Sequence, residues 1–306
     1  MKMLSEVGEV DVKPMTTEQL KDAIRDYDAV IVSVWHRVTR DIIDAGRNLK
    51  VIGTASVGTD HIDVEYAESR GGIKVVSAAG ASTYSVAEFT FGLLLMMVKR
   101  IPENMGRVKN GEWGGSLLTP GIELFGKTLG IIGLGRIGSY VASIANAFRM
   151  RVLAYDPFVD RERFIEVNAI RVDDLDDLLR QSDFITIHTS LTRESRGGLI
   201  GRREVGLMKD GGVYIINTAR GGEVVDENAI LEGLKSGKIA GYAADVLTGE
   251  PPTEETSPLL RAFKRGGEVP NLFITSHIAG VTRESVKRYT LYVAKGVRDA
   301  LMAFKR

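Results

Sequence analysis

Short apolar runs alternate with amphipathic stretches along most of the chain. In the first third, the runs at residues 28–34, 50–56 and 73–78 are each followed by a stretch in which apolar residues have helical spacing. This alternation of strand-like and helix-like segments is typical of βαβ units, whose strands are parallel. The pattern therefore predicts an α/β fold from residue 28 onward.

A second series of apolar runs begins near residue 127. Each run is short and is bounded by glycine or polar residues, as expected for parallel strands that are buried on both faces. The runs occupy residues 127–133, 151–157, 183–190, 212–221, 238–247 and 271–280. Between the two series, residues 101–125 contain two prolines and five glycines. We expect a linker there, or an arm that packs on another subunit.

Length and composition limit the possible classes of protein. A chain of 306 residues exceeds what one core usually supports, which favours two domains. Lys and Arg together number 40, as do Asp and Glu, so no net field attracts nucleic acid or an anionic membrane. The absence of cysteine excludes a disulfide scaffold and cysteine-ligated metal sites. We expect neither a nucleic-acid partner nor a bound metal.

Nothing in the hydropathy pattern predicts a membrane segment. The N-terminal residues lack the apolar core of a secretory signal. The most apolar run, residues 91–98, is far shorter than the roughly 20 residues that span a bilayer. It is typical of a buried helix, and a cytoplasmic location is the expectation.

Three glycines follow the first run of the second series. Gly133, Gly135 and Gly138 have the GxGxxG spacing and open a helix-like stretch at residues 136–148. In a dinucleotide site the first glycine permits a tight turn, the second lets the backbone approach a pyrophosphate, and the third lets helix and strand pack closely. The amides at the helix N-terminus then face the anion. The triplet alone is equally compatible with a tight structural turn.

Asp156 strengthens the dinucleotide interpretation. It ends the next strand-like run, about twenty residues after the glycines, where a carboxylate accepts hydrogen bonds from the ribose hydroxyls and repels a 2′-phosphate. Together these features predict a site that prefers NAD(H) to NADP(H). The loop by itself leaves a flavin or an S-adenosylmethionine site open.

Ionisable side chains follow three later strand-like runs. Arg220 follows the first of these runs, Asp245 and Glu250 follow the second, and His277 follows the third. Ligands of open α/β sheets bind beyond the carboxyl ends of the strands, so we expect these side chains at the same edge of the sheet. Arginine offers a planar cation for a carboxylate, histidine exchanges a proton near neutral pH, and a carboxylate orients the imidazole. This combination suits reduction of a 2-oxo acid by a nicotinamide.

These motifs resemble the D-isomer-specific 2-hydroxyacid dehydrogenase family across nearly the whole chain. The matching stretches are VGTDHID, SVAEFTFGLLL, GKTLGIIGLGRIG, NTARGGEVVDENAIL, GYAADVLTGEPP and SHIAG. The resemblance implies two Rossmann-like domains with parallel sheets. An NAD-binding domain (residues 101–279) would be inserted into a smaller, flavodoxin-like substrate domain (residues 1–100 and 280–306). It also implies a two-fold homodimer.

The resemblance assigns roles to individual residues. Arg220, Glu250 and His277 would be catalytic, and the amides of Val57 and Gly58 would bind the substrate carboxylate together with Arg220. Further NAD contacts would come from Arg136 and Ile137 at the pyrophosphate, His188 and Thr189 on the adenosine side, Thr218 and Ala219, and Asp245 at the nicotinamide carboxamide.

Departures from the family pattern bear on the substrate. The phosphoglycerate branch commonly has arginine where this chain has Ser33 and Thr54. A small unphosphorylated 2-oxo acid such as glyoxylate or hydroxypyruvate is therefore expected, with D-3-phosphoglycerate dehydrogenase as the alternative. An alternative of another class is an NADH-sensing binding protein of the corepressor type. His61, where asparagine is usual, is expected to structure its loop.

Overall fold

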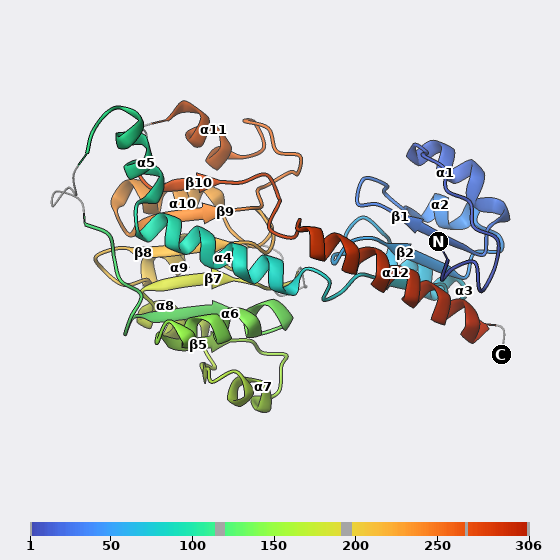
Figure 1. The fold of residues 1–306 in the computed structure, drawn as a ribbon, viewed down its shortest axis with the longest axis horizontal. Helices are drawn as coiled ribbons and strands as arrows, with labels where there is room; N and C mark the ends of the chain where they lie inside the picture. The colour runs from blue at the N-terminus through green and yellow to red at the C-terminus, as the bar shows by residue number, and fades with distance from the viewer. Residues whose placement is uncertain (1, 114–119, 191–197, 267–268, 305–306) are drawn as a thin grey trace. The chain divides into compact units, whose positions relative to one another are not determined.

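The chain divides into two compact units, which are described separately. The structure, a computed structural model, describes residues 2–113, 120–190, 198–266 and 269–304. One unit comprises Met1–Ser82 with Val281–Arg306, and the other comprises Thr83–Gly280. Both contain a parallel sheet flanked by helices (Figure 1), so the predicted α/β fold is confirmed.

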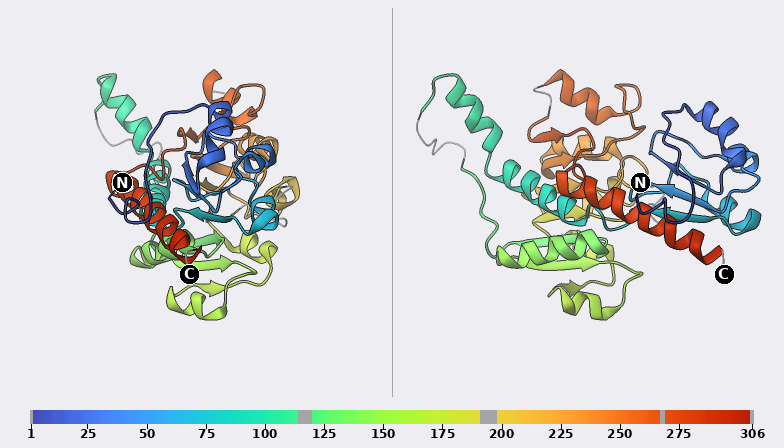
Figure 2. Two further views of the ribbon diagram at one scale, coloured as in Figure 1. Left: turned by 90° about the vertical axis from the view of Figure 1, so that its right-hand side faces the viewer. Right: turned by 45° about the vertical axis from the view of Figure 1, so that its right-hand side comes forward.

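The first unit is built on a three-stranded parallel sheet. Its strands, in the order β1-β2-β3, are Ala29–Val32, Val51–Thr54 and Lys74–Ser77, as the apolar runs predicted. One face packs against α1 (Thr17–Ala23), η1 (Ile24–Asp26), α2 (Arg40–Ala45) and α3 (Val64–Gly71). Helix α12 (Arg283–Phe304) lies along the other face (Figures 1 and 2).

Two glycines allow α12 to pack closely on this sheet. A Cβ atom at Gly53 of β2 would lie 2.8 Å from Val297 Cγ2, and one at Gly296 would lie 2.5 Å from Val76 Cγ1. Side chains at either position would push the helix away from the strands. The C-terminal helix therefore completes the core of the N-terminal segment.

The second unit contains a seven-stranded parallel sheet in the order β10-β9-β8-β7-β4-β5-β6. All six strands expected here are present, and the very short β6 was not expected. The strands are β4 Thr128–Ile132, β5 Arg151–Tyr155, β6 Ile170–Arg171, β7 Phe184–Ile187, β8 Val213–Asn217, β9 Ile239–Ala244 and β10 Leu272–Ile274.

Helices cover both faces of the seven-stranded sheet, which is why its strands are almost uniformly apolar. One face packs against α4 (Thr83–Val98), α6 (Arg136–Ala147) and α7 (Arg161–Glu166). The other packs against α8 (Leu175–Gln181), α9 (Arg202–Leu207), α10 (Glu227–Ser236) and α11 (Pro258–Arg265). The resemblance implies a domain boundary at residue 100, whereas α4 contacts α6, β8 and β9 of this unit, which begins at Thr83.

The strand order reverses between β4 and β7. From β4 the chain proceeds outward through β5 and β6, and then returns to β7 on the other side of β4. The loops after β4 and β7 consequently diverge, and ligands of open α/β sheets bind at such a reversal. The glycine loop follows β4 and is therefore at this position.

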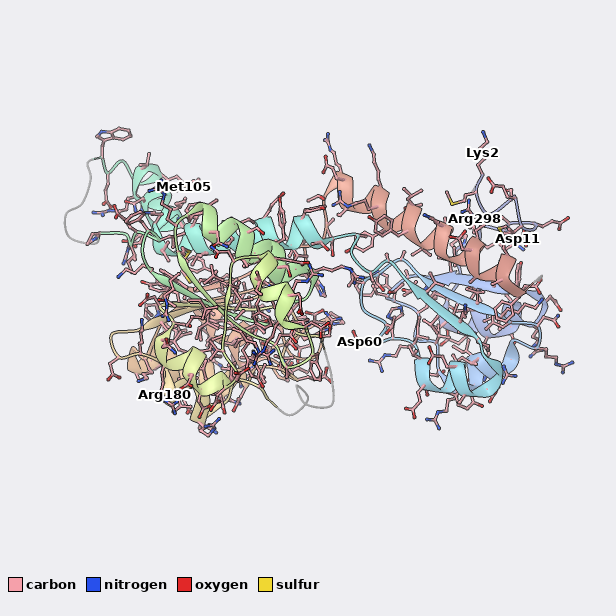
Figure 3. All side chains as sticks on the ribbon, turned by 90° about the horizontal axis from the view of Figure 1, so that it is seen from below. Lys2, Asp11, Asp60, Met105, Arg180 and Arg298 are labelled. Carbon is pink, nitrogen blue, oxygen red and sulfur yellow. The ribbon has the colours of Figure 1, made fainter. Side chains whose placement is uncertain are left out.

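Helix α5 (Ile101–Lys109) occupies part of the segment in which the sequence pattern breaks. Pro102 lies in its first turn, where a missing N–H costs no hydrogen bond. None of its residues is buried, and it extends away from the seven-stranded sheet (Figure 2). Met105, labelled in Figure 3, is 59% exposed. Residues 114–119 of the expected arm lie outside the described residues.

Candidate active site

Three loops that follow adjacent strands carry the polar side chains of the site. The last residues of β8, β9 and β10 are paired in register, so the following loops leave the sheet at one edge. Arg220 lies on the loop after β8, Glu250 on the loop after β9, and His277 on the loop after β10. All three belong to the second unit.

His277 and Glu250 form a close pair. Nδ1 of His277 lies 2.5 Å from Oε2 of Glu250, and Oε1 of Glu250 accepts a hydrogen bond from the amide of Leu247 at 3.2 Å. An ionised carboxylate only accepts hydrogen bonds, so Nδ1 carries the proton in this pair. Nε2 is left to exchange a proton with a ligand, and the His277 side chain is 57% exposed.

The environment of His277 favours the charged imidazolium. The hydrogen bond with Glu250 raises the pKa of His277 above its usual value, and burial opposes that rise. The negative charges on Glu250 and Asp245 also raise this pKa, whereas the positive charge on Arg220 lowers it. Two carboxylates thus favour the charged imidazolium and one guanidinium opposes it, and histidine can serve as an acid or a base.

Asp245 holds the turn that presents His277. Its buried carboxylate accepts hydrogen bonds from Thr275 Oγ1 at 2.6 Å, Ile278 N at 2.9 Å and Ala279 N at 2.8 Å. His277 itself has a left-handed backbone with φ of 57°, which costs energy for a residue with a Cβ. These bonds stabilise that conformation. We expected Asp245 at the nicotinamide, and sequence reasoning missed this second role.

Asn217 shapes the turn that carries Arg220. The buried Asn217 side chain donates to the carbonyl of Arg220 at 2.8 Å and accepts from the amide of Ala219 at 3.0 Å. Nη1 of Arg220 donates to the carbonyl of Ala219 at 2.9 Å. The guanidinium is therefore held close to its own turn, on the same edge of the sheet as His277.

Glu227, at the start of α10, anchors the loop that carries Glu250. Its buried carboxylate accepts from Thr248 N at 2.7 Å, Thr248 Oγ1 at 2.8 Å, Ser257 Oγ at 2.6 Å and Leu259 N at 3.3 Å. These donors lie on both sides of Glu250 in the chain. The positive end of the α10 dipole further stabilises the carboxylate. Sequence reasoning missed this residue because its partners are 21 to 32 positions away.

The glycine loop has the backbone geometry of an anion-binding turn. Gly133 has φ of 93°, and a Cβ there would lie 2.8 Å from the carbonyl carbon of His188. A Cβ at Gly138 would lie 2.0 Å from Gly133 O, so only glycine lets α6 approach β4 this closely. At Gly135, the residue before α6, a Cβ would meet nothing within 4 Å. The space beside Gly135 is therefore open.

A cavity of about 260 Å³ lies beside this loop. It is lined by Gly133, Gly135, Asp156, His188 and Thr189, among others. Oδ2 of Asp156 accepts from Leu134 N at 2.8 Å within the glycine loop, and Oδ1 accepts from Phe158 N at 2.9 Å. Each oxygen keeps a second lone pair, so the carboxylate still accepts hydrogen bonds from a ligand.

His188 lines this cavity and has a neutral, buried imidazole. Burial lowers its pKa to about 3, and neither ring nitrogen has a hydrogen-bond partner among the described residues. Residues 191–197, which follow shortly after it, lie outside that set. A neutral ring with an unpaired donor and an unpaired acceptor suits a polar heterocyclic or sugar ligand. The cavity as a whole fits the adenosine side of a dinucleotide.

The other expected ligand residues occupy three places. Arg136 and Ile137 form the first turn of α6, while Thr218 and Ala219 lie between β8 and Arg220. The hydroxyl of Thr218 pairs with that of Thr90 on α4 at 3.0 Å. Val57 and Gly58 belong to the first unit, directly after β2.

The described residues include neither a metal-binding cluster nor a membrane-spanning helix. In the part of the chain that the structure describes, no cluster of three His, Cys, Asp or Glu side chains is placed to hold a metal ion. No described helix has the length and apolar character needed to cross a membrane.

Comparison with known proteins decides the family. Residues 91–279 match the model for the D-isomer specific 2-hydroxyacid dehydrogenase, NAD binding domain. The chain belongs to this dehydrogenase family. It is 43% identical over 302 residues to D-3-phosphoglycerate dehydrogenase of Methanocaldococcus jannaschii, covering 98% of this chain and 55% of the relative. It is 41% identical to hydroxypyruvate reductase of Thermotoga maritima, covering 94% of this chain and 89% of the relative.

A solved structure extends the similarity to the fold. D-lactate dehydrogenase from Aquifex aeolicus, complexed with NAD and lactic acid, has a TM-score of 0.77 and 35% identity and covers 93% of this chain and 84% of its own. The chain spans about half the length of several curated relatives, the phosphoglycerate dehydrogenases. The Rossmann fold of the second unit and its NAD cofactor, both expected from the sequence, follow from the family.

Asp156 should set the cofactor preference of this family member. In Asp156→Ala, NADH loses a ribose acceptor, and NADPH no longer meets a repelling carboxylate. We expect the ratio of kcat/KM with NADH to that with NADPH to fall at least about tenfold, the loss of roughly one hydrogen bond to a charged group. Steady-state kinetics with both cofactors measure this ratio.

The matched control is Asp160→Ala. Asp160 lies four positions further along the chain, and its side chain makes no capping bond to α7. This substitution should leave the cofactor ratio unchanged. Equal use of NADPH and NADH by the unmodified protein would show that Asp156 does not discriminate between them.

Proposed function

We propose that the protein is an NAD-dependent oxidoreductase that interconverts a D-2-hydroxy acid and its 2-oxo acid. The observation that carries the proposal is the His277–Glu250 pair, 2.5 Å apart, on the sheet edge that also carries Arg220. These groups lie in the NAD-binding domain of the family. They are the acid, its orienting carboxylate and the cation that such a reaction requires.

Each side chain has a distinct task in the reduction. Bound NADH supplies the hydride for the carbonyl carbon. Nε2 of His277 donates a proton to the carbonyl oxygen as negative charge develops there. Arg220 binds the substrate carboxylate through its planar fork and stabilises that developing charge. Glu250 keeps Nδ1 engaged, so that Nε2 faces the substrate. In the oxidation, neutral His277 accepts the proton.

Glu250→Gln should move the pH dependence of the reaction in one direction. The hydrogen bond and charge of Glu250 raise the pKa of His277, so their loss lowers it. Reduction requires protonated His277, and its rate falls as pH rises through this pKa. We therefore expect the alkaline limb of the kcat/KM profile for reduction to shift to lower pH. An unchanged alkaline limb would show that Glu250 does not influence the pKa of His277.

We propose that the substrate is a small unphosphorylated 2-oxo acid, such as glyoxylate or hydroxypyruvate. Ser33 and Thr54, which follow or end strands of the first unit, offer hydroxyls where a phosphate needs cations. Both hydroxyls have partners within the protein: Ser33 Oγ pairs with His36 Nδ1 at 3.0 Å, and Thr54 Oγ1 pairs with Ser56 and His61. Two lost charge-assisted contacts disfavour a phosphate by about 3 kcal/mol or more.

His36 does not replace the missing cations. Its Nε2 lies 3.0 Å from the carbonyl oxygen of Met15, which can only accept, so both ring nitrogens are engaged within the unit. Arg37 is exposed on the same loop and remains the candidate for binding a phosphate. Because the chain is similar to D-3-phosphoglycerate dehydrogenases, the experiment below includes a phosphorylated substrate.

The test compares kcat/KM with NADH for glyoxylate, hydroxypyruvate and 3-phosphohydroxypyruvate. We expect the phosphorylated acid to be reduced no more efficiently than the better of the other two. A value tenfold above both would favour the phosphoglycerate alternative, and Arg37→Ser should then abolish the advantage. An NADH-sensing protein would bind NADH and turn over none of the three.

We also propose that the protein is a homodimer and is cytoplasmic. Support for the dimer comes from the exposed apolar side chains of Ile101, Met105 and Val108 on α5, and from Trp113, which is 91% exposed. Sedimentation of the protein and of Met105→Glu would test the dimer, because the charged side chain should favour the monomer. Cell fractionation would test the location.

A further inference from the structure

Three side chains form a continuous hydrogen-bond chain behind the loop after β2. Thr54, the fully buried last residue of β2, has its Oγ1 2.9 Å from Nε2 of His61 and 2.9 Å from Oγ of Ser56. Ser56 Oγ lies in turn 2.6 Å from the carbonyl oxygen of Gly58. All of these residues belong to the first unit.

The carbonyl of Gly58, at the end of this series of hydrogen bonds, fixes which group donates in each of them. The carbonyl of Gly58 only accepts, so Ser56 must donate its single hydroxyl hydrogen to it. Thr54 must then donate to Ser56, which has no hydrogen left for this contact. With the Thr54 hydrogen used, Nε2 of His61 must carry a hydrogen and donate it to Thr54. The order is His61 to Thr54 to Ser56 to Gly58.

This chain and one backbone bond fix two consecutive parts of the loop. The amide of Ala78 donates to the carbonyl of Ser56 at 2.8 Å, which sets the plane of the Ser56–Val57 peptide and hence the direction of the Val57 amide. The Ser56 hydroxyl donates to the carbonyl of Gly58 and so sets the plane of the Gly58–Thr59 peptide. The Val57–Gly58 peptide is held between these two fixed planes.

We propose that His61, acting through Thr54 and Ser56, is a positioning residue that keeps the amides of Val57 and Gly58 oriented for the carboxylate of the substrate. This rests on the proposed function and on the family resemblance, which assigns the substrate carboxylate to those amides. A loop whose amides are already oriented loses less conformational freedom on binding, so the benefit appears as substrate affinity. The donors that this loop offers to the carboxylate are thus neutral.

The charge state of His61 agrees with this role. Burial lowers the pKa of His61, and the positive charge of His36 lowers it further. The negative charge on Asp60, a residue of the same loop that is labelled in Figure 3, raises this pKa and opposes the shift. His61 is therefore neutral at pH 7 with its hydrogen on Nε2. A neutral ring that donates to Thr54 offers no charge to a carboxylate or phosphate. His61 therefore positions the loop and does not bind the substrate directly.

Substrate affinity is the first readout. Ser56→Ala and His61→Leu should each raise KM for the 2-oxo acid about tenfold, the effect of one net hydrogen bond, with kcat changed less than about threefold. Thr54→Val with Ser56→Ala should cost little more than either alone, because the chain acts as a unit. His61→Gln, whose amide can still donate, should restore most of the affinity. Ser69→Ala, on α3, is the control and should change nothing.

Two measurements keep the test independent of turnover. The dissociation constant of oxamate, an unreactive analogue of a 2-oxo acid, is measured with NADH present and should rise about tenfold in the same variants. The ¹⁵N spectrum of the unliganded protein should show Nε2 of His61 protonated and Nδ1 unprotonated at pH 7, with His61→Gln providing the assignment.

The outcomes separate the two proposals. Weaker oxamate binding in the variants, by a protein that reduces none of the acids, would contradict the proposed function and support the positioning role. Full activity with KM and oxamate binding unchanged in Ser56→Ala and His61→Leu would overturn the positioning role alone. So would a His61 that is protonated on Nδ1 or doubly protonated at pH 7. Equal thermal melting of variants and unmodified protein confirms that folding is not the cause.

Discussion

Alanine in place of His277 is expected to lower kcat for reduction of a 2-oxo acid at least about 100-fold, the usual contribution of a positioned acid. The imidazole is the group on this edge of the sheet that can deliver a proton, and Glu250 holds it by Nδ1. The dinucleotide loop is untouched, so fluorescence titration should give an unchanged dissociation constant for NADH. Stopped-flow and steady-state assays measure the turnover.

Two controls make the His277 result interpretable. Thermal melting should show that the variant is folded, because His277 is half exposed and its turn is held by Asp245 rather than by its own side chain. Loss of NADH binding would point to a structural fault instead. A fall in kcat of tenfold or less, with binding intact, would remove His277 from the proton transfer.

Lysine in place of Arg220 is expected to lower kcat/KM about 100-fold although the positive charge is kept. A guanidinium binds a carboxylate with two parallel hydrogen bonds, whereas an ammonium binds it as a point charge. Losing one charge-assisted bond and the fixed geometry costs about 1.5 to 3 kcal/mol. The turn should survive, because Asn217 holds the backbone of residue 220 and not its side chain.

Arg180→Lys is the matched control for this substitution. Arg180 is half exposed on α8, where it pairs with Asp177, and Figure 3 labels it. It should leave kcat/KM unchanged. If Arg220→Lys also kept full efficiency, the carboxylate would have to be bound by another group.

The sequence predicted the strands well, for a physical reason. Parallel strands buried on both faces need continuous apolar runs, and these are visible without knowledge of tertiary structure. The tight turn at Gly133 and the close approach at Gly138 likewise restrict those positions to glycine, so spacing alone indicated them. The pairing of Glu250 with His277 was expected because both follow adjacent strands.

The supporting contacts could not be predicted in the same way. Asp245, Asn217 and Glu227 act largely through hydrogen bonds to backbone amides and carbonyls, which nearly every residue type supplies. Helix α5 was missed because the prolines and glycines of residues 101–125 favoured a linker, although Ile101, Met105 and Val108 have helical spacing. The direct contact between Thr54 and His61, two departures from the family pattern, likewise appears only once the chain is folded.

The most direct test of the proposed reaction follows the hydride itself. NADH labelled with deuterium on its transferable position is incubated with the protein and hydroxypyruvate or glyoxylate, and the product is analysed by mass spectrometry and, for hydroxypyruvate, by chiral separation. We expect one deuterium on C2 of the hydroxy acid, and the D-isomer alone from hydroxypyruvate. NADH that binds without transferring deuterium to these acids, or a product of the L-configuration, would contradict the assignment.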